Sequence, residues 1–142
     1  MADGSGEPVL VSLTAPARRS LVAGLVRATG SGPGDTTART VDVDVADAEI
    51  ADLLAEVAHA DTGFIARTAH GDRALAIVAA TAAALCGEDI RTALSTPNIA
   101  FLTALKPPAI EAVRSVLLAI ETDTPDEVTH SLAPLAIADS PR

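Results

Sequence analysis

The sequence lacks tryptophan and tyrosine, and its only aromatic side chains are Phe64 and Phe101. It also holds a single cysteine, Cys86, and a single lysine, Lys106. One cysteine excludes an internal disulfide and a cysteine-rich zinc site. The scarcity of aromatic residues argues against a β-sandwich, whose strands are rich in aromatic and β-branched side chains. The longest apolar run, at 74–86, is too short to cross a bilayer.

Basic charge is also scarce. Lysine and arginine together number 10, against 19 aspartates and glutamates, which gives a formal net charge of -9. Binding to a nucleic-acid backbone needs a basic surface, so we expect no nucleic-acid partner. The segment 1–13 has neither the basic groups nor the long apolar stretch of a signal peptide. We therefore expect a soluble cytoplasmic protein that does not bind membranes, and whose acidity could attract a basic protein partner.

Alanine is abundant, at 30 of the 142 residues. It is the best helix former, and its small side chain lets helices approach each other closely. The composition predicts a mainly α fold: a compact helical domain with a small β element, of up to three short strands, in the N-terminal half. The alternative is an α/β fold with a small three-stranded sheet and a helical C-terminal half. The candidate strands are 9–13, 41–45 and 64–68, and whether they form one sheet stays open.

Periodicity and start signals organise the rest of the chain. We expect one globular domain at 9–137, flexible tails at 1–8 and 138–142, and a flexible glycine-rich loop at 31–37. Gly87 should end one of the helices. The expected helices are 14–30, 47–59, 72–86, 88–95, 97–106, 110–120 and 124–133.

The segment 40–61 holds seven acids and no lysine or arginine. Through Val45, valines alternate with aspartates, which is the two-residue period of a strand, and from Asp47 the apolar residues repeat with helical spacing. A calcium loop that began at Asp42 would need glycine at its sixth position and glutamate at its twelfth. The chain has Asp47 and Leu53 there, so this stretch does not fit an EF-hand.

A solvated surface is the simplest interpretation of these acids, and a docking face for a basic partner is the alternative. The acids of that candidate face are Asp42, Asp44, Asp47, Asp52 and Glu56. Arg18 and Arg19, with Arg27, form the main basic patch, on the first expected helix. They could complement the acidic face within the fold or in a neighbouring subunit.

The pattern Ala-His-x-Asp occurs at 58–61 and again at 69–72. Its four polar residues are His59, Asp61, His70 and Asp72. Imidazole and carboxylate groups bind zinc, iron or manganese, so this cluster is the candidate metal site. Apart from a possible divalent metal there, we expect no cofactor. The alternative is structural, because histidine suits a helix C-terminus and aspartate suits a helix N-cap.

Cys86, at the end of an apolar helix, reads as a small core residue and not as a nucleophile. With no compelling catalytic group, the sequence predicts a non-catalytic protein-interaction or regulatory module with an acidic face at 42–61. We expect it to self-associate as a homo-oligomer, through close packing of the small-residue helix at 74–86. Two alternatives stay open: a small metal-binding protein or enzyme that uses the His/Asp cluster, and an acidic inhibitor or immunity-type protein that binds a basic partner.

Overall fold

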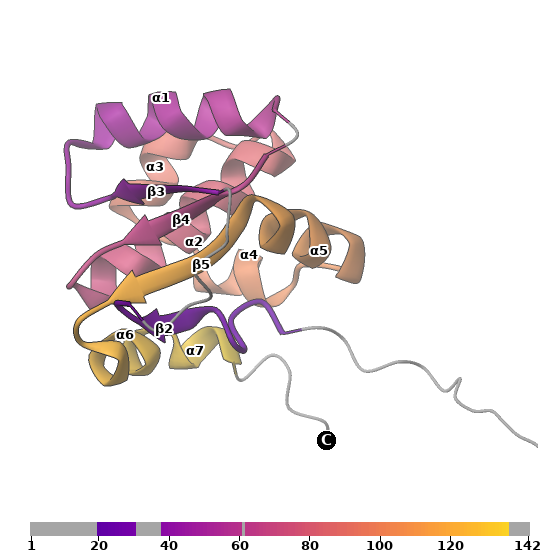
Figure 1. The fold of residues 1–142 in the computed structure, drawn as a ribbon. Coiled ribbons are helices and arrows are strands. Elements are labelled where there is room, and N and C mark those ends of the chain that lie inside the picture. Colours follow the sequence, from indigo (N-terminus) through magenta and orange to yellow (C-terminus); the bar gives the residue numbers. More distant parts are fainter. Residues whose placement is uncertain (1–19, 31–37, 61, 137–142) are drawn as a thin grey trace, which may run out of the picture.

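Four parallel strands form one sheet in the computed structural model, which describes residues 20–30, 38–60 and 62–136 (Figure 1). The strands are β2 (Val26–Ala28), β3 (Arg39–Asp42), β4 (Phe64–Arg67) and β5 (Leu117–Thr122). Their order across the sheet is β2-β5-β4-β3, so β2 and β3 are its two edges within the described residues.

Helices complete the chain between and after these strands. They are α1 (Asp47–Ala58), α2 (Gly71–Cys86), α3 (Ile90–Ser95), α4 (Ile99–Thr103), α5 (Pro107–Val116), α6 (Pro125–Ser131) and α7 (Ala133–Ala136). Helix α1 connects β3 to β4, and α2 to α5 connect β4 to β5. In Figure 1, α2 lies behind the sheet, α1 lies along the top, and α6 and α7 lie below.

The small-residue helix α2 is the centre of the core. Its side chains from Ala76 to Ala83 are all buried, between the sheet and the helices that surround it. The helix approaches α6 so closely that a Cβ added at Gly71 would lie 2.0 Å from the Ser131 hydroxyl oxygen. It ends at Gly87, whose left-handed backbone (φ 77°) favours glycine. This end was correctly predicted.

The central strands β4 and β5 are buried because a parallel sheet is covered on its faces. Phe64, Ile65 and Ala66 of β4 are at most 2% exposed. Helix α1 packs its apolar stripe of Ile50, Leu54 and Val57 into the same core. Helix α1 begins at Asp47 as predicted, whereas the strand expected at 41–45 lies at Arg39–Asp42.

The mainly α prediction is wrong, since the described residues form a small α/β fold with a four-stranded parallel sheet. The alternative named the α/β class but expected three strands and no strand in the C-terminal half. Residues 26–28, expected within a helix, form the edge strand β2. The helix expected at 110–120 ends at Val116, and Leu117 begins the central strand β5.

Other expectations have mixed outcomes. The pair Pro107-Pro108, expected to end a helix, begins α5 at its first turn. Helix α6 begins at Pro125 as predicted, and β4 matches the strand expected at 64–68. The strand at 9–13, the loop at 31–37 and both tails lie outside the described residues. Within the described part of the chain, no helix is long and apolar enough to cross a membrane.

Candidate functional site

The acids at the carboxyl end of β3 bond to the protein itself. The carboxylate of Asp42 accepts the backbone N–H of Asp44 at 2.9 Å. Asp44 in turn accepts the Thr68 hydroxyl at 2.6 Å and the Ala69 N–H at 3.4 Å. Asp44 therefore joins the β3–α1 connection to the β4–α2 connection. Neither Asp44 nor Asp47 caps α1, because Ala46 is at the N-cap position and no side chain caps the helix.

Arg73, in the first turns of α2, holds the same connection from the other side. Its guanidinium donates to the carbonyls of Val43 and Val45, at 2.6 and 2.5 Å, and pairs with the Asp47 carboxylate at 2.8 Å. Val43 is fully buried, so its carbonyl depends on an internal donor. One arginine thus fixes the whole turn between β3 and α1.

A further internally bonded acid, Glu121, lies on the central strand β5. Its carboxylate pairs with Arg67 of β4 at 2.9 Å and with Arg27 of β2 at 3.2 Å. The hydrogen bond from Arg67 is the main reason why the pKa of Glu121 is below its ordinary value; burial opposes this lowering and Arg27 adds to it. Arg27 is therefore engaged within the sheet, and Arg18 and Arg19 lie outside the described residues.

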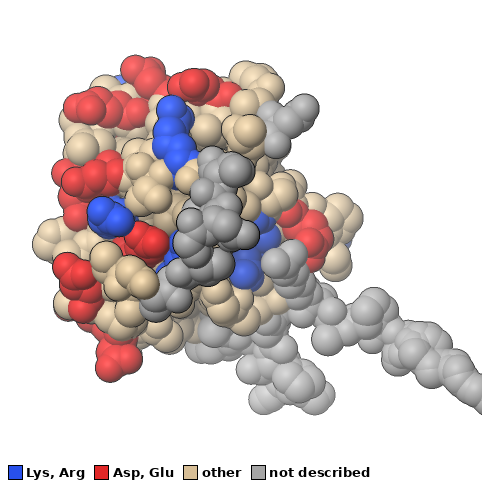
Figure 2. Space-filling view, viewed as in Figure 1, with Lys and Arg blue, Asp and Glu red and all other residues tan. Residues whose placement is uncertain are grey.

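The acids of α1 differ. Glu49, Asp52 and Glu56 are exposed and, within the described residues, form no hydrogen bond or ion pair through their side chains. Their spacing of three and four residues places them in one stripe along the helix. In the space-filling view, acidic side chains gather at the top of the molecule, over α1 (Figure 2).

This stripe faces the edge strand β3 across a groove of about 570 Å³. We call it the β3–α1 groove. All four residues of β3 line one wall, and Glu49, Asp52, Leu53 and Glu56 line the other. The groove thus holds four carboxylates, counting Asp42, and one guanidinium, that of Arg39. Asp42, Asp52 and Glu56 were predicted as part of an acidic face, whereas Arg39, Thr40 and Glu49 were not. The spacing of three residues between Glu49 and Asp52 was the signal that could have identified Glu49.

The described residues of the predicted metal cluster, His59, His70 and Asp72, do not come together. His59 lies at the end of α1, before β4, whereas His70 and Asp72 lie after β4, at the start of α2. A parallel strand separates the two ends, and Asp61 lies outside the described residues. His70 and Asp72 do line a hollow of about 570 Å³ together with Asp44 and Asp47. Within the described part of the chain, no three potential metal ligands converge.

Cys86 is exposed at the last turn of α2, so the expectation of a core cysteine is wrong. Burial along the helix decreases after Ala83, since Ala84 and Leu85 are only partly buried.

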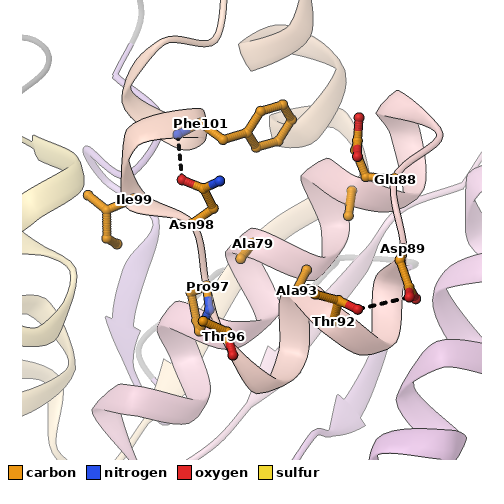
Figure 3. Close-up of a pocket in the computed structure, with 11 residues that line it drawn as sticks. Ala79, Glu88, Asp89, Thr92, Ala93, Thr96, Pro97, Asn98, Ile99 and Phe101 are labelled. Carbon is orange, nitrogen blue, oxygen red and sulfur yellow. Dashed lines mark hydrogen bonds between the residues drawn. The ribbon is translucent and has the colours of Figure 1, made fainter.

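A second hollow, of about 580 Å³, lies between α2, α3 and α4 (Figure 3). Ala79, Ala83 and Ala93 line it, and the Phe101 ring points toward Glu88 across its upper part. Asp89 lies at its rim and caps α3; the hydrogen bond from the Thr92 side chain is the main cause of a lowered pKa at Asp89. The sequence does not indicate this pocket. Its walls come from three helices whose apolar residues have the spacing of any amphipathic helix.

Comparisons of the chain with protein-family models, with curated proteins and with solved structures found no significant match.

Proposed function

We propose that this protein is a non-catalytic interaction module that binds a basic segment of a protein partner in the β3–α1 groove. One observation carries the proposal. Glu49, Asp52 and Glu56 line a groove together, yet none of them forms an ion pair among the described residues, although Arg39 lies in the same groove. The carboxylates of the groove would attract a segment that contains lysine or arginine, both while the two proteins approach and once the complex has formed.

The contrast with the internal acids supports this choice. Where the fold needs a carboxylate, as at Asp47 or Glu121, an arginine lies beside it at hydrogen-bonding distance. The three acids of the α1 stripe form no such bond among the described residues. Three like charges in one stripe destabilise the helix slightly through mutual repulsion. Since they do not stabilise the fold, a role in binding would explain their presence.

The proposal includes the inhibitor-type alternative, because an acidic inhibitor would use the same groove and differ only in what its partner then fails to do. It does not include a homo-oligomer. Self-association was expected from packing of the small-residue helix between subunits, but α2 is buried inside one copy. Any dimer would have to use another surface.

The test is a binding titration with a defined probe: a fluorescent eight-residue peptide that alternates lysine with threonine. Neutralising the stripe (Glu49→Gln/Asp52→Asn/Glu56→Gln) should weaken binding at least tenfold. The matched control neutralises three exposed acids elsewhere (Asp123→Asn/Asp126→Asn/Glu127→Gln), changes the net charge equally, and should weaken binding less than threefold. Equal losses in the two variants would mean that only net charge attracts the peptide, and would refute the proposal.

A further inference from the structure

The edge strand β3 has an open side that faces the groove. Among the described residues β3 pairs only with β4, and Arg39, Thr40 and Asp42 are exposed. In a strand, the backbone N–H and C=O of successive residues point to opposite sides. The Val43 N–H donates to Arg67 of β4, so by alternation those of Val41 also point to β4.

The same alternation directs the N–H and C=O of Thr40 and Asp42 away from β4. Within the described part of the chain, neither residue has another backbone partner for these groups. Two donors and two acceptors, four backbone groups in all, therefore lie along the β3 wall of the β3–α1 groove. An extended segment laid against β3 could satisfy all four, which is how a peptide adds a strand to an open sheet edge.

The dimensions of the two walls agree with an extended occupant. Glu49 and Glu56 are seven positions apart along α1, which corresponds to about 10 Å at a rise of 1.5 Å per residue. The four residues of β3 span about 10 Å between their ends, at about 3.3 Å per residue. Alternate side chains of an added strand are about 6.6 Å apart, so two of them on one face could reach the acidic stripe of α1.

We infer that the partner segment binds as an added β-strand along β3, with its backbone paired to Thr40 and Asp42 and with basic side chains at alternate positions toward α1. This inference rests on the proposed function, since it names the way in which the basic segment is held. Charge alone would accept a helix, a coil or a strand. The open backbone of β3 favours the strand, and it adds hydrogen bonds that salt does not screen.

Backbone methylation of the probe peptide separates strand addition from electrostatic docking. One isomer carries N-methyl groups on every lysine and the other on every threonine, so both keep the same charge and the same number of methyl groups. A strand paired along one edge uses the N–H groups of alternate residues only. One isomer should therefore bind at least tenfold more weakly than the unmethylated peptide, and the other within threefold of it.

Two substitutions in β3 give the complementary test. Thr40→Pro removes an outward N–H and keeps the ladder to β4, because proline is tolerated where an edge N–H faces solvent. It should fold, as judged by circular dichroism, and bind the probe at least tenfold more weakly. Val41→Pro removes an inward N–H and should reduce stability instead. The peptide isomers decide the question if Thr40→Pro does not fold.

The outcomes are distinguishable. If both methylated isomers bind as the parent peptide does, strand addition is wrong and the acidic groove remains a docking site. If the parent peptide does not distinguish the stripe variant from its control, the proposed function itself fails.

Discussion

Two sets of acids lie within a few residues of each other in this molecule, and they do different work. Asp44, in the β3–α1 connection, and Asp47, the first residue of α1, each accept hydrogen bonds from the β4–α2 region. Glu49, Asp52 and Glu56, on the helix that follows, have no such bonds among the described residues. The boundary between the sets falls at the first turn of α1.

The number of acids in a stretch of sequence therefore does not reveal which of them form hydrogen bonds or ion pairs within the folded protein. Both sets belong to one acidic stretch, 40–61, with no lysine or arginine in it. What separates them is the set of partners that the β4–α2 region supplies: Thr68 and Ala69 bond to Asp44, and Arg73 bonds to Asp47. Substitutions should therefore affect stability in one set and binding in the other.

The largest effect on stability should come from Arg73→Ala. The substitution removes three bonds to the β3–α1 connection and leaves the carbonyl of the buried Val43 without its donor. We expect a loss of about 3 kcal/mol in the free energy of unfolding, measured with urea. The control is Arg91→Ala, whose guanidinium is exposed and forms no hydrogen bond within the described residues. A loss no larger than that of the control would show that Asp47 belongs with the unbonded acids.

A smaller effect is expected from Glu121→Gln. Glutamine keeps the shape but loses the charge that pairs with Arg67 and Arg27, so we expect a loss of about 2 kcal/mol at neutral pH. The exposed Glu88→Gln serves as its control and should change the free energy of unfolding by less than about 0.5 kcal/mol.

The effect of Glu121 should depend on pH in a defined direction. Its pKa is lower in the folded protein than the ordinary value of 4.5, so the unfolded chain binds the proton more tightly. The stability that the carboxylate contributes is therefore complete above pH 4.5 and is lost as the pH falls through the folded-state pKa. The difference in free energy of unfolding between wild type and Glu121→Gln should narrow below pH 4.5. A constant difference across this range would contradict the ion-pair interpretation.

The smallest effect on stability should come from the stripe variant Glu49→Gln/Asp52→Asn/Glu56→Gln. Removal of like charges three and four residues apart should leave the free energy of unfolding unchanged or raise it by about 0.5 kcal/mol. The same variant is expected to bind the basic peptide far more weakly. A loss of stability comparable with that of Arg73→Ala would mean that these acids are part of the fold after all.

Elements with a strong local pattern were predictable from the sequence. The change of period at Asp47 correctly predicted α1, and Gly87 correctly predicted the end of α2. The strand β5 was not predictable in this way. Its apolar residues Leu117 and Ile120 continue the helical spacing of α5, and a short apolar run fits a buried strand and a helix equally well. Burial between two neighbouring strands decides for the strand, and no local signal carries that information.

The candidate site was predictable in part for the same reason. The acids of α1 could be identified because helical spacing places them in one stripe. The partner of Asp47 could not, because Arg73 is 26 residues away along the chain. His59 does not converge with His70, because the two residues lie before and after the strand β4. The pattern Ala-His-x-Asp therefore repeats without bringing its two histidines together.

The open side of β3 also bears on how the protein behaves at high concentration. Exposed strand edges are sites where identical chains join and then aggregate. Here, two copies that approached edge to edge would bring Asp42 and the acids of α1 against the same acids of the other copy. The repulsion favours dispersed monomers in dilute buffer and weakens as salt is added. At high salt concentration, where the repulsion between these acids is screened, copies of the protein should therefore begin to associate through β3.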